Sequence, residues 1–261
     1  MVVGRGTSCR VEIVSNDGSF AAPSINEKKG FGAGWVGSID AAGLPVKPVA
    51  NLSVAPLMNP ETDFDVVEKA QEAVMLFEDL RNFTKLSETT LPYDVVYIVN
   101  KYDATCGKAI EANTGRLDKF IGDGIMAIFE ASDSIEMNCK RGVKAASEIS
   151  KQIKMLSQDL SKEISAEVKC GMAIHTGQSI VGMMGYGDTV SRTAIGYNVN
   201  VASRLEQMTK AYNSDLIIFK QVAKQAALKT SEFVEESVEV RGRNEKLDIV
   251  STPDASQLQF S

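Results

Sequence analysis

Two aspartates stand where apolar segments give way to short polar loops, and each could bind a metal ion. Asp79 ends an apolar run that leads into the polar stretch 81–84, and Asp123 lies in a Gly-Asp-Gly turn between two short apolar segments. Such a loop exposes backbone N–H groups that can cradle phosphate oxygens, while a carboxylate can hold a magnesium ion that bridges to them. Taken singly, a strand-end acid or a turn aspartate more often only faces water. If the two strands are neighbours, Asp79 and Asp123 can converge on the same metal ions.

A third segment, 193–206, carries polar side chains at helical spacing. Asn200 and Arg204 are four residues apart and share one helix face, whereas Val201 and Leu205 share a neighbouring face that can pack inward. An exposed Asn and Arg on a helix are usually a solvated surface. Small residues on the same stretch would, however, let another surface approach closely.

Strands and amphipathic helices must position these residues, and they begin after about residue 60. The pattern predicts a strand over 72–77, a helix over 91–112, a hairpin of 115–121 with 125–129, and a helix over 134–160. A second hairpin is expected over 167–174 and 179–183, turning at 175–177, followed by a helix over 198–212 and strands over 216–219, 233–240 and 246–250. This order is that of the ferredoxin-like split βαβ unit, an α+β fold with helices on one face of an antiparallel sheet.

Composition limits the class of protein. The 261 residues are 44% hydrophobic and 24% charged, enough for one globular domain and a smaller appendage. A net charge of −6 and a pI near 5.1 argue against a nucleic-acid surface. The chain has a single histidine, His175, so carboxylates, lysines and arginines must carry most of the chemistry. The four cysteines are scattered along the sequence and are expected to be reduced, structural thiols. No apolar run approaches the ~18 residues of a membrane span and the start lacks a signal-peptide layout, so we expect a cytoplasmic protein.

Four segments, taken in order, resemble the class III nucleotidyl cyclase catalytic domain. The usual family pattern is F-x-D-I-x-G-F-T, K-F-x-G-D-x-x-M-A-x-F, I-H-T-G and G-D-x-V-N-x-A-x-R-L-E, and this chain has LFEDLRNFT, DKFIGDGIMAIF, AIHTG and AIGYNVNVASRLE. The resemblance covers residues 70–250. Asn82 replaces the usual glycine of the phosphate loop, a change that a residue tolerant of positive φ can accommodate. Tyr197 replaces the usual aspartate and puts the catalytic rate in doubt.

The resemblance implies an adenylate cyclase that converts ATP to 3',5'-cyclic AMP and pyrophosphate with two Mg²⁺ or Mn²⁺ ions per site. It implies a homodimer with two composite sites, and it leaves His175 as a turn-stabilising residue rather than a base. The implied roles are metal binding by Asp79, Asp123 and the Leu80 carbonyl, purine recognition by Lys119 and Thr193, phosphate binding by Phe83, Thr84 and Arg241, and ribose and transition-state contacts by Asn200 and Arg204.

The choice of ATP rests on two side chains. A lysine donor and a threonine acceptor complement the N1 acceptor and N6 amine of adenine, whereas guanine reverses this edge. Family members that use GTP are known for a glutamate and a small or cysteine side chain at the places of Lys119 and Thr193. A guanylate cyclase, or a catalytically weak nucleotide-binding or dimerisation module, stays an alternative.

Residues 1–60 differ in composition from residues 61–261, which carry the cyclase motifs. The first part is rich in Gly, Pro, Ala and Ser and is predicted to be a separate, weakly cored module. GRGTSCRVEI and NLSVAPL resemble remnants of a plant-type two-iron, two-sulfur ferredoxin, but that cluster needs four cysteines and Cys9 stands alone before residue 106. We therefore expect no iron–sulfur cluster; a degenerate sensor, a shortened protein and a chance likeness are the open alternatives. The sequence does not identify the activating signal.

Overall fold

The computed structural model describes residues 2–5, 8–11, 69–132, 134–186, 189–241 and 245–260. The chain forms two compact units, Met1–Thr62 and Asp63–Ser261. In the first, β1 (Val2–Arg5) pairs antiparallel with β2 (Ser8–Val11). The segment NLSVAPL lies outside the described residues, and the ferredoxin likeness of residues 1–60 stays a prediction.

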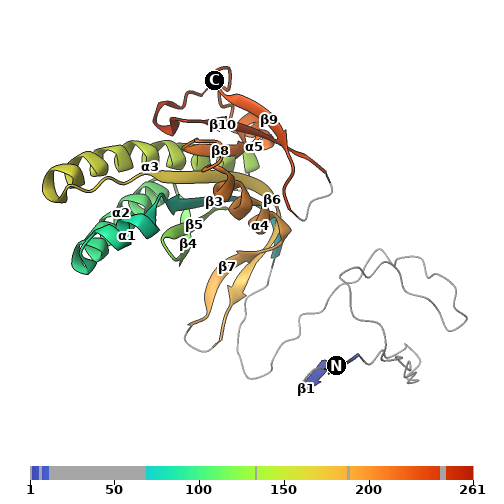
Figure 1. Cartoon of the computed structure of the whole chain (residues 1–261). Coiled ribbons are helices and arrows are strands. Elements are labelled where there is room, and N and C mark those ends of the chain that lie inside the picture. Colours follow the sequence, from blue (N-terminus) through green and yellow to red (C-terminus); the bar gives the residue numbers. More distant parts are fainter. Residues whose placement is uncertain are drawn as a thin grey trace, which may run out of the picture. The chain divides into compact units, whose positions relative to one another are not determined.

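One eight-stranded sheet forms the centre of the second unit (Figure 1). Its order is β4-β5-β3-β6-β8-β10-β9, with β7 paired to β6 beside this path. All neighbouring strands are antiparallel except β6 and β8, which are parallel. The strands are β3 (Lys69–Leu80), β4 (Arg116–Ile121), β5 (Gly124–Phe129), β6 (Cys170–Met184), β7 (Ser191–Ile195), β8 (Leu216–Phe219), β9 (Val234–Val238) and β10 (Leu247–Thr252).

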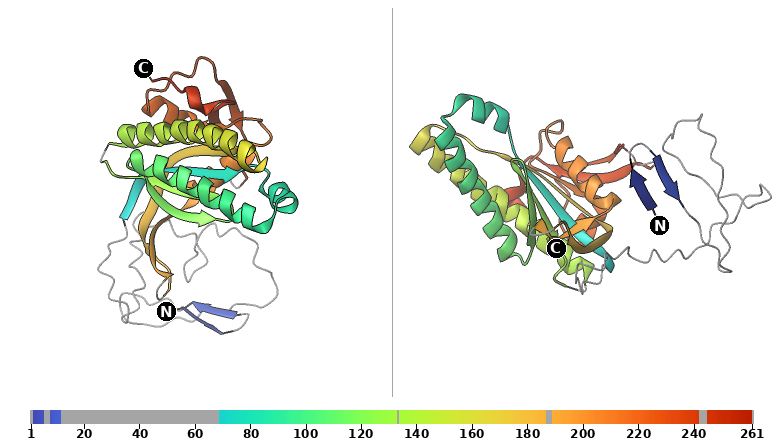
Figure 2. Two further views of the ribbon diagram at one scale, coloured as in Figure 1. Left: turned by 90° about the vertical axis from the view of Figure 1, so that its left-hand side faces the viewer. Right: turned by 90° about the horizontal axis from the view of Figure 1, so that it is seen from below.

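Helices cover both faces of this sheet, not one face as the sequence predicts (Figure 2). On one face lie α2 (Pro92–Ala112), α3 (Ile135–Ile164) and the short α5 (Lys220–Gln225), and on the other lies α4 (Tyr197–Met208). Two further short helices are α1 (Phe83–Thr89) and a 3₁₀ turn at Ala255–Gln257.

The side chains of β3 explain the second helical layer. Val74 and Leu76 belong to the core under α2 and α3, whereas Ala73, Met75 and Phe77 belong to the core under α4. Successive side chains of a strand point to opposite faces, so a continuous apolar run must be covered on both.

The hairpin expected at 175–177 is wrong. β6 runs unbroken from Cys170 to Met184, pairs with β3 over the full length of that strand, and then forms a hairpin with β7. Gly177 is not a turn residue: a Cβ there would lie 2.4 Å from the side-chain amide of Asn198. The glycine therefore makes room for the start of α4 rather than for a change of direction.

Two other expectations concern the cysteines and the membrane. Cys106, Cys139 and Cys170 are buried free thiols, and burial raises the pKa of Cys139 to about 12, which agrees with structural, unreactive thiols. Within the parts of the chain that the structure describes, no helix is long and apolar enough to cross a membrane.

Candidate active site

Asp79 and Asp123 lie at the same end of two neighbouring strands. Asp79 is the cross-strand partner of Gly124, and the backbone N–H of Leu80 donates to the carbonyl of Asp123 at 3.3 Å. A Cβ at Gly124 would lie 3.3 Å from Asp79 Oδ1, so the glycine keeps the space beside this carboxylate open. The structure thus brings together the two aspartates that the sequence singles out.

Negative charge accumulates around Asp79. Burial and the nearby Asp123 raise the pKa of Asp79, while Lys210, whose Nζ lies 3.4 Å from Asp79 Oδ2, lowers it. Burial and Asp79 raise the pKa of Glu206 to about 7. Burial, followed by Asp79, also raises the pKa of Glu78 well above its usual range. Lys210 and Arg81 both lower the pKa of Asp79 without offsetting burial and Asp123, so an added cation would stabilise the charged form of this carboxyl group.

This donor set fits divalent ions that are shared with a substrate. In the described ranges, no group of three or more His, Cys, Asp or Glu side chains could hold a metal ion by itself. Mg²⁺ is commonly bound by one or two carboxylates while phosphate oxygens and water complete its shell, and Asp79 and Asp123 would suit such a site.

A cavity of about 330 Å³ opens beside Asp79. Its walls come from the ends of β3, β4 and β5 and from one stripe of α4, and it is lined by Phe77, Glu78, Asp79, Ile121, Gly124, Ile125, Ser203, Glu206, Gln207 and Lys210. Asp123, Asn200 and Arg204 are not among the lining residues. Arg204 Nη1 instead donates to the backbone carbonyl of Arg241, and Asn200 is exposed. Within one chain, the structure does not bring the two residues predicted to be catalytic to the aspartates.

His175 holds the start of α4 in place. It is 1% exposed in the middle of β6, its Nε2 lies 3.1 Å from Asn198 Oδ1, and its ring packs 4.7 Å from that of Phe219. Asn198 in turn donates to the carbonyl of Gln178 at 2.8 Å. The turn that His175 was expected to stabilise does not exist; the imidazole orients the helix that carries Asn200 and Arg204.

Lys119 and Thr193 meet at a third side chain that the sequence analysis missed. Thr193 Oγ1 donates to Asp118 Oδ2 at 2.5 Å, and Lys119 Nζ lies 3.5 Å from the same oxygen. Asp118 precedes Lys119 directly in the DKFIGDG segment. The two residues predicted to recognise the purine are therefore neighbours, although they come from β4 and β7.

Residues 66–250 match the model of the adenylate and guanylate cyclase catalytic domain. The chain belongs to this cyclase family. Two curated relatives are similar to this cyclase domain: a terminal-differentiation-specific adenylate cyclase of Dictyostelium discoideum, 35% identical over 186 residues, and an adenylate cyclase of Anabaena cylindrica, 32% identical over 178 residues. The matches cover 70% and 67% of this chain but only 9% and 35% of the relatives, so the chain spans a small part of their length.

Solved structures confirm the α+β fold of this cyclase domain. The guanylyl cyclase Cya2 superposes with a TM-score of 0.64 at 24% identity, over 72% of this chain and 94% of that one. The adenylyl cyclase CyaB from P. aeruginosa gives a TM-score of 0.65 at 24% identity, over 71% and 95%. The match of residues 66–250 to the family model confirms the family resemblance inferred from the four motifs.

The predicted phosphate loop of the cyclase domain is intact despite its asparagine. Asn82 adopts the left-handed conformation, with φ 58° and ψ 29°, and its carbonyl accepts the first helical bond of α1, from Leu86 at 3.0 Å. This bears out the expectation that asparagine tolerates the glycine position. Phe83 packs partly buried against the core, and Thr84 is exposed at the start of α1. The side chain of Phe83 therefore serves the core at least in part, and a ligand contact would come most directly from its backbone.

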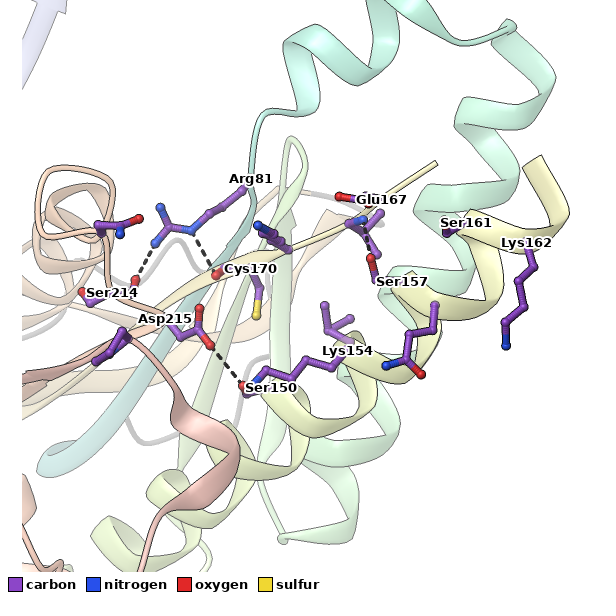
Figure 3. Close-up of a pocket in the computed structure, with 16 residues that line it drawn as sticks. Arg81, Ser150, Lys154, Ser157, Ser161, Lys162, Glu167, Cys170, Ser214 and Asp215 are labelled. Atoms are coloured by element: carbon purple, nitrogen blue, oxygen red, sulfur yellow. Dashed lines mark hydrogen bonds between the residues drawn. The ribbon is translucent and has the colours of Figure 1, made fainter. Parts of the chain in front are cut away.

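Figure 3 shows a larger groove, of about 790 Å³, between α3, the start of β6 and residues 213–215. Arg81 donates from this groove to the carbonyls of Cys170 at 3.1 Å and Ser214 at 2.5 Å, and Ser150 donates to Asp215 at 3.3 Å. These bonds tie the strand ends together. None of the predicted site residues of the cyclase domain lines the groove.

Proposed function

We propose that this cyclase domain converts ATP to 3',5'-cyclic AMP and pyrophosphate at two sites shared between the chains of a homodimer. The observation that carries the choice of ATP is the pairing of Lys119 with Thr193 beside Asp118. Lysine offers donors to N1 of adenine, and a threonine oxygen accepts from the N6 amine. An unmatched buried polar group costs about 1–3 kcal/mol, enough to discriminate against guanine.

Each predicted residue has a role that suits its chemistry. Asp79, Asp123 and the Leu80 carbonyl would hold two Mg²⁺ or Mn²⁺ ions, which lower the charge of the triphosphate and activate the ribose 3'-hydroxyl. Asn200 orients the ribose, and Arg204 stabilises the charge that grows on the α-phosphate as the bond to pyrophosphate breaks.

The triphosphate needs contacts of its own. Arg241 is exposed and adds positive charge for the phosphates, and the exposed Thr84, with the backbone at Phe83, completes the phosphate loop. The bond from Arg204 uses the backbone carbonyl of Arg241 and does not occupy the Arg241 side chain.

Two features support the homodimer. Arg204 is hydrogen-bonded to the carbonyl of Arg241 and Asn200 is exposed, so a second copy would supply these side chains if they act at the same site as Asp79 and Asp123. In addition, the cross-strand partners Ile180 and Ile195 are 45% and 53% exposed. Paired apolar side chains at a surface are typical of a contact with another protein.

Mixing two inactive variants tests the shared site. Asp123→Ala and Arg204→Ala chains should each lose activity alone, because each homodimer carries two damaged sites. A mixed dimer keeps one intact site, so random pairing should restore about a quarter of wild-type activity. The product is measured by chromatography of cyclic AMP after incubation with ATP and Mn²⁺. If mixed dimers form and activity does not return, the shared-site arrangement is wrong.

A nucleotide comparison tests the base. Wild-type protein should prefer ATP to GTP, and the double variant Lys119→Glu, Thr193→Cys should move the preference toward GTP. A wild type that prefers GTP would refute the assignment of ATP. ATP binding without any cyclic product would instead favour a nucleotide-binding module.

A further inference from the structure

We propose that Asp118 is a positioning residue that sets the purine preference of this site by committing the Thr193 hydroxyl to act as a hydrogen-bond acceptor. The inference rests on the proposed function, because it assumes that Lys119 and Thr193 face the purine. It assigns a role to a side chain that touches both of them.

Asp118 is buried between three partners. Its side chain is 0% exposed; Oδ1 accepts from Arg116 Nη1 at 3.0 Å, and Oδ2 accepts from Thr193 Oγ1 at 2.5 Å. Lys119 Nζ lies 3.5 Å from Oδ2, and Thr193 is 4% exposed. A carboxylate has acceptor oxygens only, so the hydrogen bond between Thr193 and Asp118 uses the proton of the threonine hydroxyl.

A β-bulge brings Asp118 to this place. Leu117 pairs with Ala127, but Lys119 already pairs with Met126, so Asp118 is an extra residue in β4. In a regular strand, consecutive side chains point to opposite faces. A bulge bends the strand and redirects a side chain, and bulges of this kind are frequent beside active sites. The bulge explains how the consecutive residues Asp118 and Lys119 come within 3.5 Å of each other.

Arg116 fixes the orientation of the carboxylate. Its Nη1 also donates to the carbonyl of Arg192 in β7 at 2.7 Å, and its Nε donates to Glu130 at 3.2 Å. β4 and β7 are thereby tied together on either side of Asp118. The bond between Asp118 and Thr193 is consequently part of a fixed network rather than a contact between two mobile side chains.

The consequence for the purine follows from the single proton of a hydroxyl group. A free threonine hydroxyl can rotate to donate to a 6-oxo group or to accept from a 6-amino group. With its proton held by Asp118, Thr193 offers only lone pairs. The 6-amino group of adenine can donate to these lone pairs. The 6-oxo group of guanine or hypoxanthine is itself an acceptor, so it would face the acceptor oxygen of Thr193 without forming a hydrogen bond. A site built around a fixed donor or acceptor rejects the wrong group more strongly than an adaptable one.

The test compares ATP with ITP, which differ only at position 6 and at the protonation of N1. Asp118→Asn keeps the shape of the side chain but offers an N–H to Thr193, so the hydroxyl can donate to an oxo group. The ratio of kcat/KM for ATP to that for ITP should fall at least tenfold in Asp118→Asn, and likewise in Asp118→Ser. Asp79 and Asp123 are unchanged, so Mn²⁺ binding by titration calorimetry should stay at the wild-type value.

Thr193→Val supplies the matched control, because it keeps the side-chain shape and removes the hydroxyl. If Asp118 acts through this hydroxyl, Asp118→Asn should not change the ATP-to-ITP ratio further in the Thr193→Val background. Variants that unfold, or that lose ATP and ITP turnover in equal proportion, would give Asp118 a structural role only and overturn the proposal. If the wild type prefers ATP and the Asp118 variants keep the wild-type ATP-to-ITP ratio, the role given to Asp118 is refuted while the proposed function stands. A wild type without an ATP preference removes the proposed function as well.

Discussion

Replacing Glu206 with glutamine should stabilise the protein at alkaline pH and leave it nearly unchanged in acid. Glu206 is 8% exposed, its Oε1 is buried without a hydrogen-bond partner among the described residues, and its pKa is raised to about 7 from an ordinary 4.5, first by burial and then by Asp79. A raised carboxyl pKa means that the native state keeps a proton that the unfolded state has released between pH 4.5 and 7. Stability therefore falls as pH rises through this window.

The size of the effect follows from the same shift. The rise of the Glu206 pKa from 4.5 to about 7, at ~1.4 kcal/mol for each pH unit, gives a ceiling of about 3.5 kcal/mol. Water in the open cavity and the charge of Lys210 screen the carboxylate, and we halve the ceiling to about 1.8 kcal/mol. For a domain of this size, that corresponds to a melting temperature higher by roughly 4–7 °C for Glu206→Gln above pH 8.

The assay is thermal unfolding from pH 4.5 to 8.5 in a chelating buffer, with wild type and variant side by side. Other carboxyl groups titrate in both proteins, so the difference between the two curves reports Glu206. Glu232→Gln, which removes an exposed carboxylate, is the matched control and should give a constant difference. A Glu206→Gln difference that does not grow between pH 5 and 8 would refute the argument from burial.

Three further predictions concern packing and charge. Gly177→Ala should destabilise by about 1–3 kcal/mol, because its Cβ would strike Asn198, whereas Gly107→Ala in α2 meets only Leu117 at 3.7 Å and should stabilise by about 0.5–1 kcal/mol in denaturant titrations. If the two substitutions changed the stability equally, the close packing of α4 against Gly177 would be contradicted. Lys210→Met should tighten Mn²⁺ binding two- to fivefold, because the lysine competes for Asp79; calorimetry with Lys246→Met as control checks this, and weaker binding would mean that Lys210 helps the ion. Tyr102→Phe should stabilise by about 0.5–1 kcal/mol, since the buried hydroxyl has no partner among the described residues, and a clear loss of stability would reveal one.

The places of Asp79 and Asp123 at strand ends could be predicted because they depend on local signals, whereas their convergence also required β3 and β5 to be neighbours. A tight hairpin can be recognised from a few consecutive residues. The same is true of an apolar strand that ends in a carboxylate. The order of the main strands and helices followed from periodicity for the same reason. The short helices α1 and α5, of seven and six residues, have too few turns to show a period and were not anticipated.

Features that depend on distant partners could not be predicted. His175-Thr176-Gly177 looks like a turn because small and polar residues interrupt an apolar pattern. Position 177 instead requires a glycine because the side chain of Asn198, from α4, packs directly against it. Asp118 looks like one more charge beside Lys119, and only the bulge and β7 reveal its contact with Thr193. Sequence motifs locate the residues that belong to the site. Side chains that position those residues, such as Asp118, are recognised only from their contacts in the tertiary structure.

The ladder between β3 and β6 also dictates the order in which the domain can be built. Its two strands are separated in the chain by α1, α2, β4, β5 and α3, so their pairing must close a very long loop. Pairings of such sequence separation make folding slow. During synthesis, β3 leaves the ribosome well before β6 and has β5 as its first partner, with its other edge uncovered. The nascent domain therefore passes through a stage in which a long apolar strand edge is open to pairing with other chains.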